Sequence, residues 1–167
     1  MTTDKLDELW DAYNRQGQMI GVQRRGDVMP PATYHLTVAI LVFVGPDQLL
    51  LQRRGHQKLN HPDTWDVAAG GSALRGETAA QAASRELAEE LGLEHSFTTP
   101  LTTVWHESWF EAIFAINLPQ LTLEQLRLQA SEVSAAKIVT LETAAALMSG
   151  QSTDWGDIIA QAQTKIG

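Results

Sequence analysis

The chain of 167 residues contains no cysteine, which excludes disulfide bonds, thiolate metal sites and cysteine nucleophiles. It also lacks a long apolar run, because the longest one, Leu36 to Val44, is about half of what a membrane-spanning helix needs. Residues 1–5 have neither the basic start nor the apolar stretch of a signal peptide. We therefore expect a cytoplasmic protein that is not inserted in a membrane.

Basic residues are also few, since 12 Lys and Arg stand against 20 Asp and Glu and the net charge is −8. Such a chain has no broad positive field for a nucleic-acid backbone, so polymeric nucleic acid is not an expected partner. A small phosphorylated substrate remains compatible, because Mg²⁺ is commonly shared between protein carboxylates and substrate phosphates. With 44% apolar and 19% charged residues, residues 1–167 have the composition of one globular domain.

The apolar pattern predicts strands interspersed with helices. Residues 6–25 suit a hairpin around the turn at 14–17, although residues 4–13 also suit a short helix, and residues up to 32 continue as an extension. The expected strands are 35–44, 48–54, 65–69, 102–107, 110–118 and 133–140, and the expected helices are 79–91, 141–148 and 154–166. A loop is expected from Gly70. This order implies an α/β protein with a mixed sheet and helices on its faces.

The segment 79–91 has the clearest helix signals. Thr78 and Gln81 form a capping box at its start, and Gly92 supplies a left-handed cap at its end. Its apolar face is expected to consist of Ala80, Ala83, Leu87 and Leu91.

Glu86, Glu89 and Glu90 stand at positions i, i+3 and i+4, so their carboxylates are expected to share the other face. Like charges at these spacings cost about 0.2 to 0.5 kcal/mol per pair, and a bound cation removes that cost. An oxygen-only cluster suits Mg²⁺ or Mn²⁺. Arg85 is expected to point away from this face. For an isolated Glu-rich helix, a solvated acidic face would be the simpler interpretation.

The surroundings of the helix favour the metal-site interpretation. Gly71, Glu77 and the run Arg85-Glu86-Leu87-Ala88-Glu89-Glu90-Leu91-Gly92 match every fixed position of the Nudix box at its spacing. Such a match arises by chance in about one chain in ten million. The chain therefore resembles the Nudix hydrolases over roughly residues 35–147. The resemblance implies an α/β/α sandwich with a mixed sheet, in which residues 71–93 form a loop, a helix and a loop at the active site.

The resemblance also implies roles for the box residues. Glu86, Glu89 and Glu90 correspond to ligands of the divalent metal, and the carbonyl of Gly71 is a further ligand. Glu77 corresponds to the partner of Arg85 in bracing the loop, while Gly92 is structural. The implied reaction is Mg²⁺-dependent or Mn²⁺-dependent hydrolysis of a diphosphate linkage in a small metabolite, most of all a nucleoside diphosphate derivative. Because many relatives dimerise, a homodimer is an assembly to test.

Basic residues before the short strand 65–69 are candidate phosphate contacts. Arg53, Arg54 and Lys58 belong to a pattern, with Gln52, Pro62, Trp65 and Gly70, that resembles the isopentenyl-diphosphate isomerase branch of the superfamily. In that branch the residues matching Arg54 and Lys58 contact the diphosphate, and a guanidinium suits paired phosphate oxygens.

The chain departs from the isomerase at two chemical groups. The catalytic cysteine of the isomerase falls at Gly70, and its metal-binding histidine falls at Ser72. Isomerase activity is therefore rejected, although an isoprenoid-diphosphate-processing enzyme and a catalytically inactive nucleotide-binding module remain alternative hypotheses. His35 matches another metal-ligand position of the isomerase, and without its partners it is expected to be structural.

Hydrolysis also needs a general base. Glu132 resembles an additional acidic residue that Nudix enzymes place late in the chain, and Glu111, on a predicted strand, is the alternative. Trp105, Trp109 and Phe110 are candidates for stacking on a nucleobase, although aromatic residues on strands more often belong to the core.

Overall fold

The computed structural model describes residues 2–166. In chain order the elements are β1 (Leu9–Tyr13), β2 (Met19–Arg24), β3 (Tyr34–Phe43), β4 (Gln48–Arg54), β5 (Trp65–Asp66), β6 (Ala69–Ser72), α1 (Ala79–Leu91), β7 (Thr102–Trp105), β8 (Trp109–Asn117), the 3₁₀ turn η1 (Leu123–Gln125), β9 (Val133–Thr140), α2 (Leu141–Leu147) and α3 (Trp155–Ile166). No helix in this part of the chain has the length and apolar character needed to cross a bilayer.

Strand β3 is the centre of a mixed sheet. One of its edges pairs with β8 in parallel along its length, and β8 continues the sheet to β7. Its other edge is shared by β1, β6 and β4 in turn, all antiparallel to it. Strand β4 pairs with β3 only at Val42 and Phe43, and then continues against β9 and β5. The sheet therefore splits between β4 and β6.

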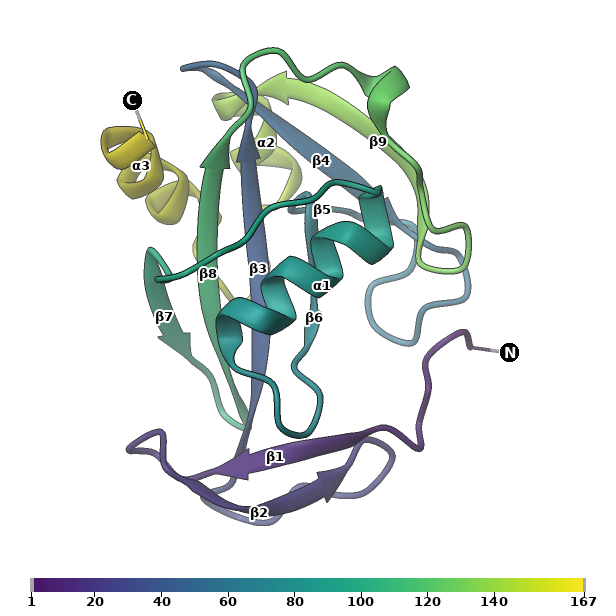
Figure 1. Cartoon of the computed structure of the whole chain (residues 1–167), viewed down its shortest axis with the longest axis vertical. Helices are drawn as coiled ribbons and strands as arrows, with labels where there is room; N and C mark the ends of the chain where they lie inside the picture. Colours follow the sequence, from purple (N-terminus) through teal and green to yellow (C-terminus); the bar gives the residue numbers. More distant parts are fainter. Residues whose placement is uncertain (1, 167) are drawn as a thin grey trace.

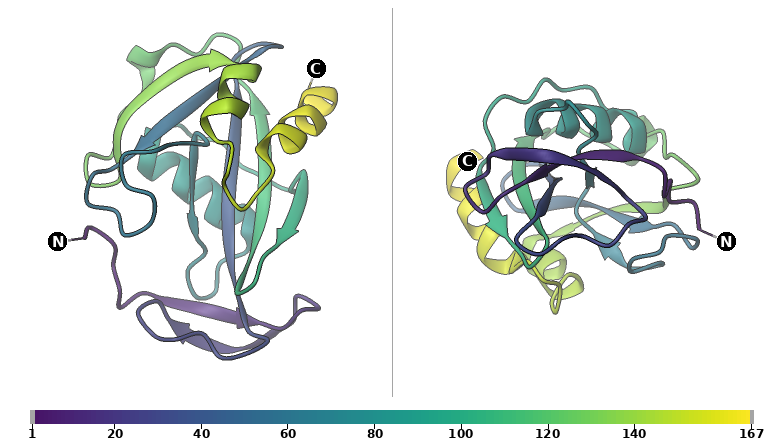
Figure 2. Two further views of the ribbon diagram at one scale, coloured as in Figure 1. Left: turned by 180° about the vertical axis from the view of Figure 1, so that it is seen from behind. Right: turned by 90° about the horizontal axis from the view of Figure 1, so that it is seen from below.

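The helices form a layer on each face of the sheet, as the two opposite views show (Figures 1 and 2). Alternate residues of β3 point to opposite sides, because side chains alternate along a strand. Val38 and Ile40 pack in the core under α1, whereas Ala39 and Leu41 pack in the core under α2 and α3. The structure is thus the α/β/α sandwich with a mixed sheet that was expected.

The N-terminal segment forms the hairpin β1–β2, not the alternative helix. Its turn is closed by a hydrogen bond from the Asn14 N–H to the Gln18 carbonyl at 2.9 Å. The hairpin also contacts the loop before α1, where the Arg75 N–H donates to Leu9 O at 2.9 Å and the Gly76 N–H donates to the Asp11 carboxylate at 2.9 Å. These bonds hold the N-terminal extension against the box (Figure 1).

One predicted boundary was wrong. The segment from Gly70 to Ser72 was expected to begin a loop, but it forms most of β6 and pairs with Thr37, Val38 and Ala39 of β3. The predicted strand 65–69 is accordingly divided between β5 and β6. Glycine is unfavourable in strands in general, and here it is required because α1 and β3 approach the backbone closely.

Helix α1 begins and ends as its sequence predicts. Thr78 accepts a hydrogen bond from the Gln81 N–H at 3.2 Å, and the Gln81 side chain accepts one from the Thr78 N–H at 2.9 Å. Gly92 adopts φ 70°, and its N–H donates to Ala88 O. Ala83, Leu87 and Leu91 are buried as expected. The caps therefore set where the helix begins and ends.

Replacement of Thr78 by alanine should lower the free energy of unfolding by about 1 kcal/mol, because the N–H of Gln81 loses its side-chain acceptor. Urea denaturation followed by circular dichroism measures the change. Thr99→Ala, on the exposed loop beyond α1, is the matched control and should change stability by less than about 0.5 kcal/mol. Equal losses in both variants would contradict the importance of this cap.

Candidate active site

The three glutamates of α1 lie in different environments. Glu90 is 5% exposed, and its carboxylate accepts hydrogen bonds from Gln52 Nε2 at 2.6 Å and from the Gly70 N–H at 3.0 Å. Glu86 is also largely buried and is a neighbour of Glu90. Glu89 is half-exposed. The helix thus directs two carboxylates against the split of the sheet and one toward solvent.

Arg85 does not point away from the carboxylates, so that expectation was wrong. Its guanidinium forms a two-bond pair with Glu77 at 2.7 and 2.8 Å, as the resemblance implied, and donates to Ser72 O at 3.2 Å. It also donates to Glu86 at 2.9 Å and to Glu89 at 3.2 Å. The long, flexible side chain of an arginine next to the carboxylate face can bend toward the negative charges on that face.

Burial raises the pKa of Glu90 well above its usual value, and the neighbouring charge of Glu86 raises it further. Burial likewise raises the pKa of Glu86, although the charge and hydrogen bond of Arg85 act in the opposite direction. Ionisation of each carboxylate thus disfavours ionisation of the other, and a positive charge beside the pair would relieve this repulsion. A divalent cation can supply that charge.

The donor set fits a hard divalent cation, because it consists of carboxylate oxygens. Gly71 makes room for it: a Cβ at this position would lie 2.5 Å from Glu86 Oε1, so any larger residue displaces this carboxylate. Within residues 2–166 no three His, Cys, Asp or Glu side chains converge on one point as they now stand. Glu89 is turned to Arg85, so its joining a metal site requires that this bond open.

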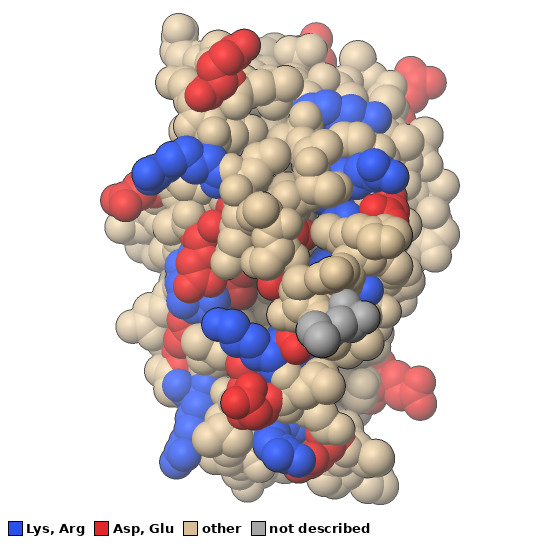
Figure 3. Space-filling model, turned by 90° about the vertical axis from the view of Figure 1, so that its right-hand side faces the viewer, with Lys and Arg blue, Asp and Glu red and all other residues tan. Residues whose placement is uncertain are grey.

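The three candidate phosphate contacts are already engaged by acceptors. Arg53 is paired with Asp63 at the surface, and Arg54 donates to Asn60 O at 2.9 Å and lies 3.7 Å from Asp66. Figure 3 shows Lys and Arg side chains interleaved with Asp and Glu on this side of the molecule, without a separate basic patch. The positive charges near the site are therefore locally compensated.

Lys58 belongs to a buried cluster that includes a candidate base. Its side chain is 9% exposed, and the ammonium donates to Asp4 and to Glu132, both at 2.5 Å. Asp4 is 2% exposed and also accepts from Arg25 at 2.8 Å and from the Leu59 N–H at 2.8 Å. The N-terminal segment thereby holds the loop 55–64 and the loop before β9 together.

The loop that carries Glu132 is attached to the C-terminal end of α1. The Gln129 N–H donates to Glu90 O at 3.0 Å, and the Glu132 N–H donates to Gln129 O at 2.9 Å. Gly55 packs against this loop, since a Cβ there would lie 3.1 Å from Ser131 O. Glu132 is therefore linked by backbone bonds to the helix of the box.

Glu111, the other candidate base, has a different setting. Its neighbours Phe110 and Ala112 point to the α1 side, so Glu111 points to the side of α3. Its carboxylate accepts a hydrogen bond from Thr153 Oγ1 at 2.8 Å, and this hydroxyl lies 3.2 Å from His106 Nε2. Burial raises the pKa of Glu111, and the charge of Asp66 adds to the effect.

The aromatic candidates separate into core and partly exposed residues. Phe110 is 9% exposed and stacks on Trp105 with the ring centroids 4.4 Å apart, so it belongs to the core. Trp109 is half-buried and stacks on His106 at 4.3 Å. His35 stacks on Trp10 at 4.0 Å, and burial lowers its pKa to about 4, which keeps it neutral. His35 thus occupies a packed position at the start of β3.

The structure also explains why the isomerase cysteine has no counterpart. A Cβ at Gly70 would lie 2.7 Å from Val38 O, which is backbone of the paired strand. A cysteine at this position requires the backbone of β6 or β3 to shift. Burial of Glu90 beneath this strand makes such a shift costly.

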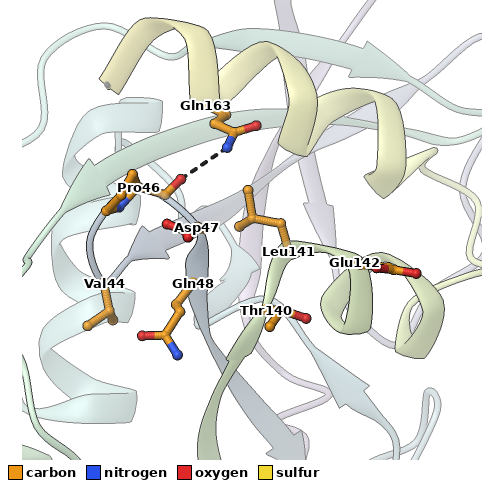
Figure 4. A pocket seen from close by; sticks show the side chains of 8 residues that line it. All are labelled: Val44, Pro46, Asp47, Gln48, Thr140, Leu141, Glu142 and Gln163. Carbon is orange, nitrogen blue, oxygen red and sulfur yellow. Dashed lines mark hydrogen bonds between the residues drawn. The ribbon is translucent and has the colours of Figure 1, made fainter.

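A surface pocket lies away from these residues, at the other end of β4 (Figure 4). The Gln163 side chain closes one side of it by donating to Pro46 O at 3.1 Å. Its lining includes Asp47 and Glu142 but no Lys, Arg or His. It lacks the positive charge that a phosphorylated ligand needs.

Comparison with known proteins identifies the family. The model of the NUDIX domain matches residues 33–156. The chain belongs to the Nudix hydrolases. An uncharacterized Nudix hydrolase of Listeria monocytogenes is 38% identical over 145 residues, which are 85% of each chain. A crystal structure of DR0079 from Deinococcus radiodurans covers 93% of this chain and 99% of its own, with a TM-score of 0.75 and 23% identity. The protein is thus an enzyme of the Nudix pyrophosphohydrolase class.

The looser similarity to the isomerase branch is also found. An isopentenyl-diphosphate Delta-isomerase of Saccharopolyspora erythraea is 40% identical over 81 residues, which are 48% of this chain and 42% of the isomerase. The similarity is partial in both chains. In this chain the position of the isomerase cysteine is Gly70.

Sequence reasoning did not single out three residues that the structure brings to the site. Asp4 and Asp66 are separated in sequence from the box and carry no local pattern, so only the fold reveals their burial. Gln52 belongs to the isomerase-like pattern, which assigns it no function in the site. A polar residue directly after the apolar run Leu49-Leu50-Leu51 was the available signal, because buried polar groups need a partner.

Asp4→Asn should destabilise the protein by about 2 kcal/mol at neutral pH. Burial alone would raise the pKa of Asp4, but hydrogen bonds from the Leu59 N–H, Lys58 and Thr2 and the charge of Lys58 lower it from 3.8 to about 2. A lowered folded-state pKa stabilises the protein above pH 3.8, and this contribution is lost as the pH falls through about 2.

Urea denaturation of both proteins as a function of pH tests the effect, with Asp7→Asn from the exposed part of the same segment as control. The difference between wild type and Asp4→Asn should shrink below pH 4. A difference that is constant with pH would show that the charge of Asp4 does not contribute.

Proposed function

We propose that the protein hydrolyses a diphosphate linkage in a small phosphorylated metabolite, in a reaction that depends on Mg²⁺ or Mn²⁺ held by Glu86, Glu89 and Glu90. The observation that carries the proposal is the largely buried pair Glu86 and Glu90, whose oxygen atoms suit a divalent cation that would also remove their repulsion. A solvated acidic face would leave these residues exposed and fully ionised.

The bound cation would neutralise the diphosphate oxygens and acidify a water molecule, which is the chemistry that this class of reaction needs. The protein supplies the arrangement around it. Arg85 and Glu77 brace the loop 73–78 against α1, and Gly71 keeps the space beside Glu86 open. The carbonyl of Gly71 is a further proposed ligand.

Arg54 is the best placed of the basic candidates to contact a phosphate. Arg54 lies two residues after Gln52 in β4, and side chains alternate along a strand. Both side chains therefore lie on the side of the strand that faces Glu90. Arg53 lies on the other side and is bonded to Asp63. Lys58 reaches a phosphate only if its bond to Asp4 or Glu132 opens, so we assign it to the support of that loop as well.

Glu132 is the proposed general base. Its loop is bonded to the end of α1, whereas Glu111 points to the side of the sheet that α3 covers. Lys58 holds the Glu132 carboxylate in one position, as a base that accepts a proton from water must be held.

The proposed substrate is a nucleoside diphosphate derivative. Trp109 lies on the same side of the sheet as Glu111 and stacks there on His106, so it does not support this choice. The net charge of −8 supports a small substrate over a polymer.

The proposal is tested by ³¹P NMR of reactions in ¹⁸O-labelled water, using nucleotide sugars, ADP-ribose, dinucleoside polyphosphates, nucleoside triphosphates, coenzyme A and isoprenoid diphosphates. We expect label in a phosphate product, Mg²⁺-dependent turnover, and none in excess EDTA. Glu90→Gln should lower kcat about 100-fold or more, and Glu94→Gln, an exposed residue beyond the helix, should not change it. Conversion of isopentenyl diphosphate to dimethylallyl diphosphate without phosphate release would overturn the proposal.

Glu132→Gln should lower kcat by about 10²-fold or more, since the water loses its base, while Glu111→Gln should change kcat only a few-fold. The two variants are compared on the same substrate, with circular dichroism as the check on folding. The reverse order would transfer the role to Glu111, and small effects in both would return it to the box glutamates.

A further inference from the structure

Gln52 is a buried amide in an apolar strand. It is 4% exposed and follows Leu49, Leu50 and Leu51, which are all buried. A buried amide without partners destabilises a protein, so the hydrogen-bond partners of Gln52 indicate its role. The amide nitrogen of Gln52 donates two hydrogen bonds, one to Glu90 Oε2 at 2.6 Å and one to Ala68 O at 3.1 Å.

The bond to Ala68 fixes the orientation of the amide. Both acceptors, a backbone carbonyl and a carboxylate, require a donor, so the amide nitrogen must face them and the amide oxygen cannot. Ala68 lies in the connection between β5 and β6, which both belong to the sheet. The donor that meets Glu90 is therefore held by the sheet and does not depend on α1.

The two oxygens of Glu90 are held separately. Gln52 donates to Oε2, and the Gly70 N–H donates to Oε1 at 3.0 Å. The carboxylate plane is thus set by one donor from β4 and one from β6, across the split of the sheet. Glu89, in contrast, is bonded to Arg85 on its own helix and is half-exposed.

We propose that Gln52 is a positioning residue that holds the Glu90 carboxylate in the orientation in which it coordinates the divalent cation. The proposal rests on the assignment of Glu90 to the metal site made above. Without Gln52, Glu90 Oε2 loses its donor and the carboxylate can rotate more freely. Binding of the cation must then restrict a side chain that the sheet restricts before the cation binds. Partners that orient a metal ligand in this way commonly contribute about 10-fold to 100-fold to metal affinity.

The test is Mn²⁺ binding in the absence of substrate, measured by the electron paramagnetic resonance signal of free Mn²⁺. Gln52→Met, which has a similar length but no donor, should weaken Mn²⁺ binding about 10-fold to 100-fold. Gln48→Met, at the exposed start of the same strand, is the matched control and should bind as wild type. Gln52→Asn keeps an amide but withdraws it from Glu90, so it should weaken binding in the same direction and covers the case in which Gln52→Met does not fold.

Glu90→Gln separates this inference from the proposed function. If it loses Mn²⁺ binding while a folded Gln52 variant binds as wild type, the role of Gln52 is overturned and the metal site stands. If Glu90→Gln binds Mn²⁺ as wild type does, the assignment of the metal site and the role of Gln52 both fall. Lower thermal stability of the Gln52 variants with unchanged Mn²⁺ affinity would show a purely structural role and would also overturn the inference.

Discussion

The Glu90 carboxylate lies where α1 crosses the split of the sheet, and the neighbouring parts of the structure are arranged around its burial. A carboxylate removed from water needs donors or a counter-charge, because its desolvation costs several kcal/mol. Gln52 and the Gly70 N–H supply two donors from separate strands. Glu86 approaches from the same helix, so a positive charge beside the pair would relieve their repulsion. The divalent cation that we propose would supply this charge.

Close approach of β3 and of α1 to β6 makes glycine necessary at two consecutive positions, each for a different reason. At Gly70 a side chain would meet the backbone of β3, and at Gly71 it would meet the carboxylate of Glu86. The first constraint keeps the strands paired beneath the site, and the second keeps space within it. The glycine that stands in the place of the isomerase cysteine therefore serves packing.

Positive charges near the site are held by carboxylates that come from distant parts of the chain. Arg85 bridges Glu77, Glu86 and Glu89, while Lys58 bridges Asp4 and Glu132. In an acidic protein these pairs fix the few basic residues in place and limit repulsion among the carboxylates. They also tie the N-terminal segment to the loops around the box.

Local patterns determined most of the elements. The caps at Thr78 and Gly92 and the regular spacing of apolar residues predicted α1 to the residue, because a helix of this kind is specified by its own sequence. Both ends of strand β9 were also predicted to the residue, since its residues suit a half-buried strand. The strand β6 was missed, because its two glycines favour a loop until the neighbouring helix and strand are known.

The amino-acid sequence by itself determined the family, the acidic helix face and the candidate glutamates, since these depend on residue types at fixed spacing along one element. Only the tertiary structure decided that Glu90 is buried, that Arg85 turns toward the carboxylates and that Asp4 holds Lys58. Each of these depends on the distance between segments far apart in the chain, and such distances follow from the packing of the sheet and helices. Hydrogen bonds and charges act over a few ångströms, so their partners are known only when that packing is known.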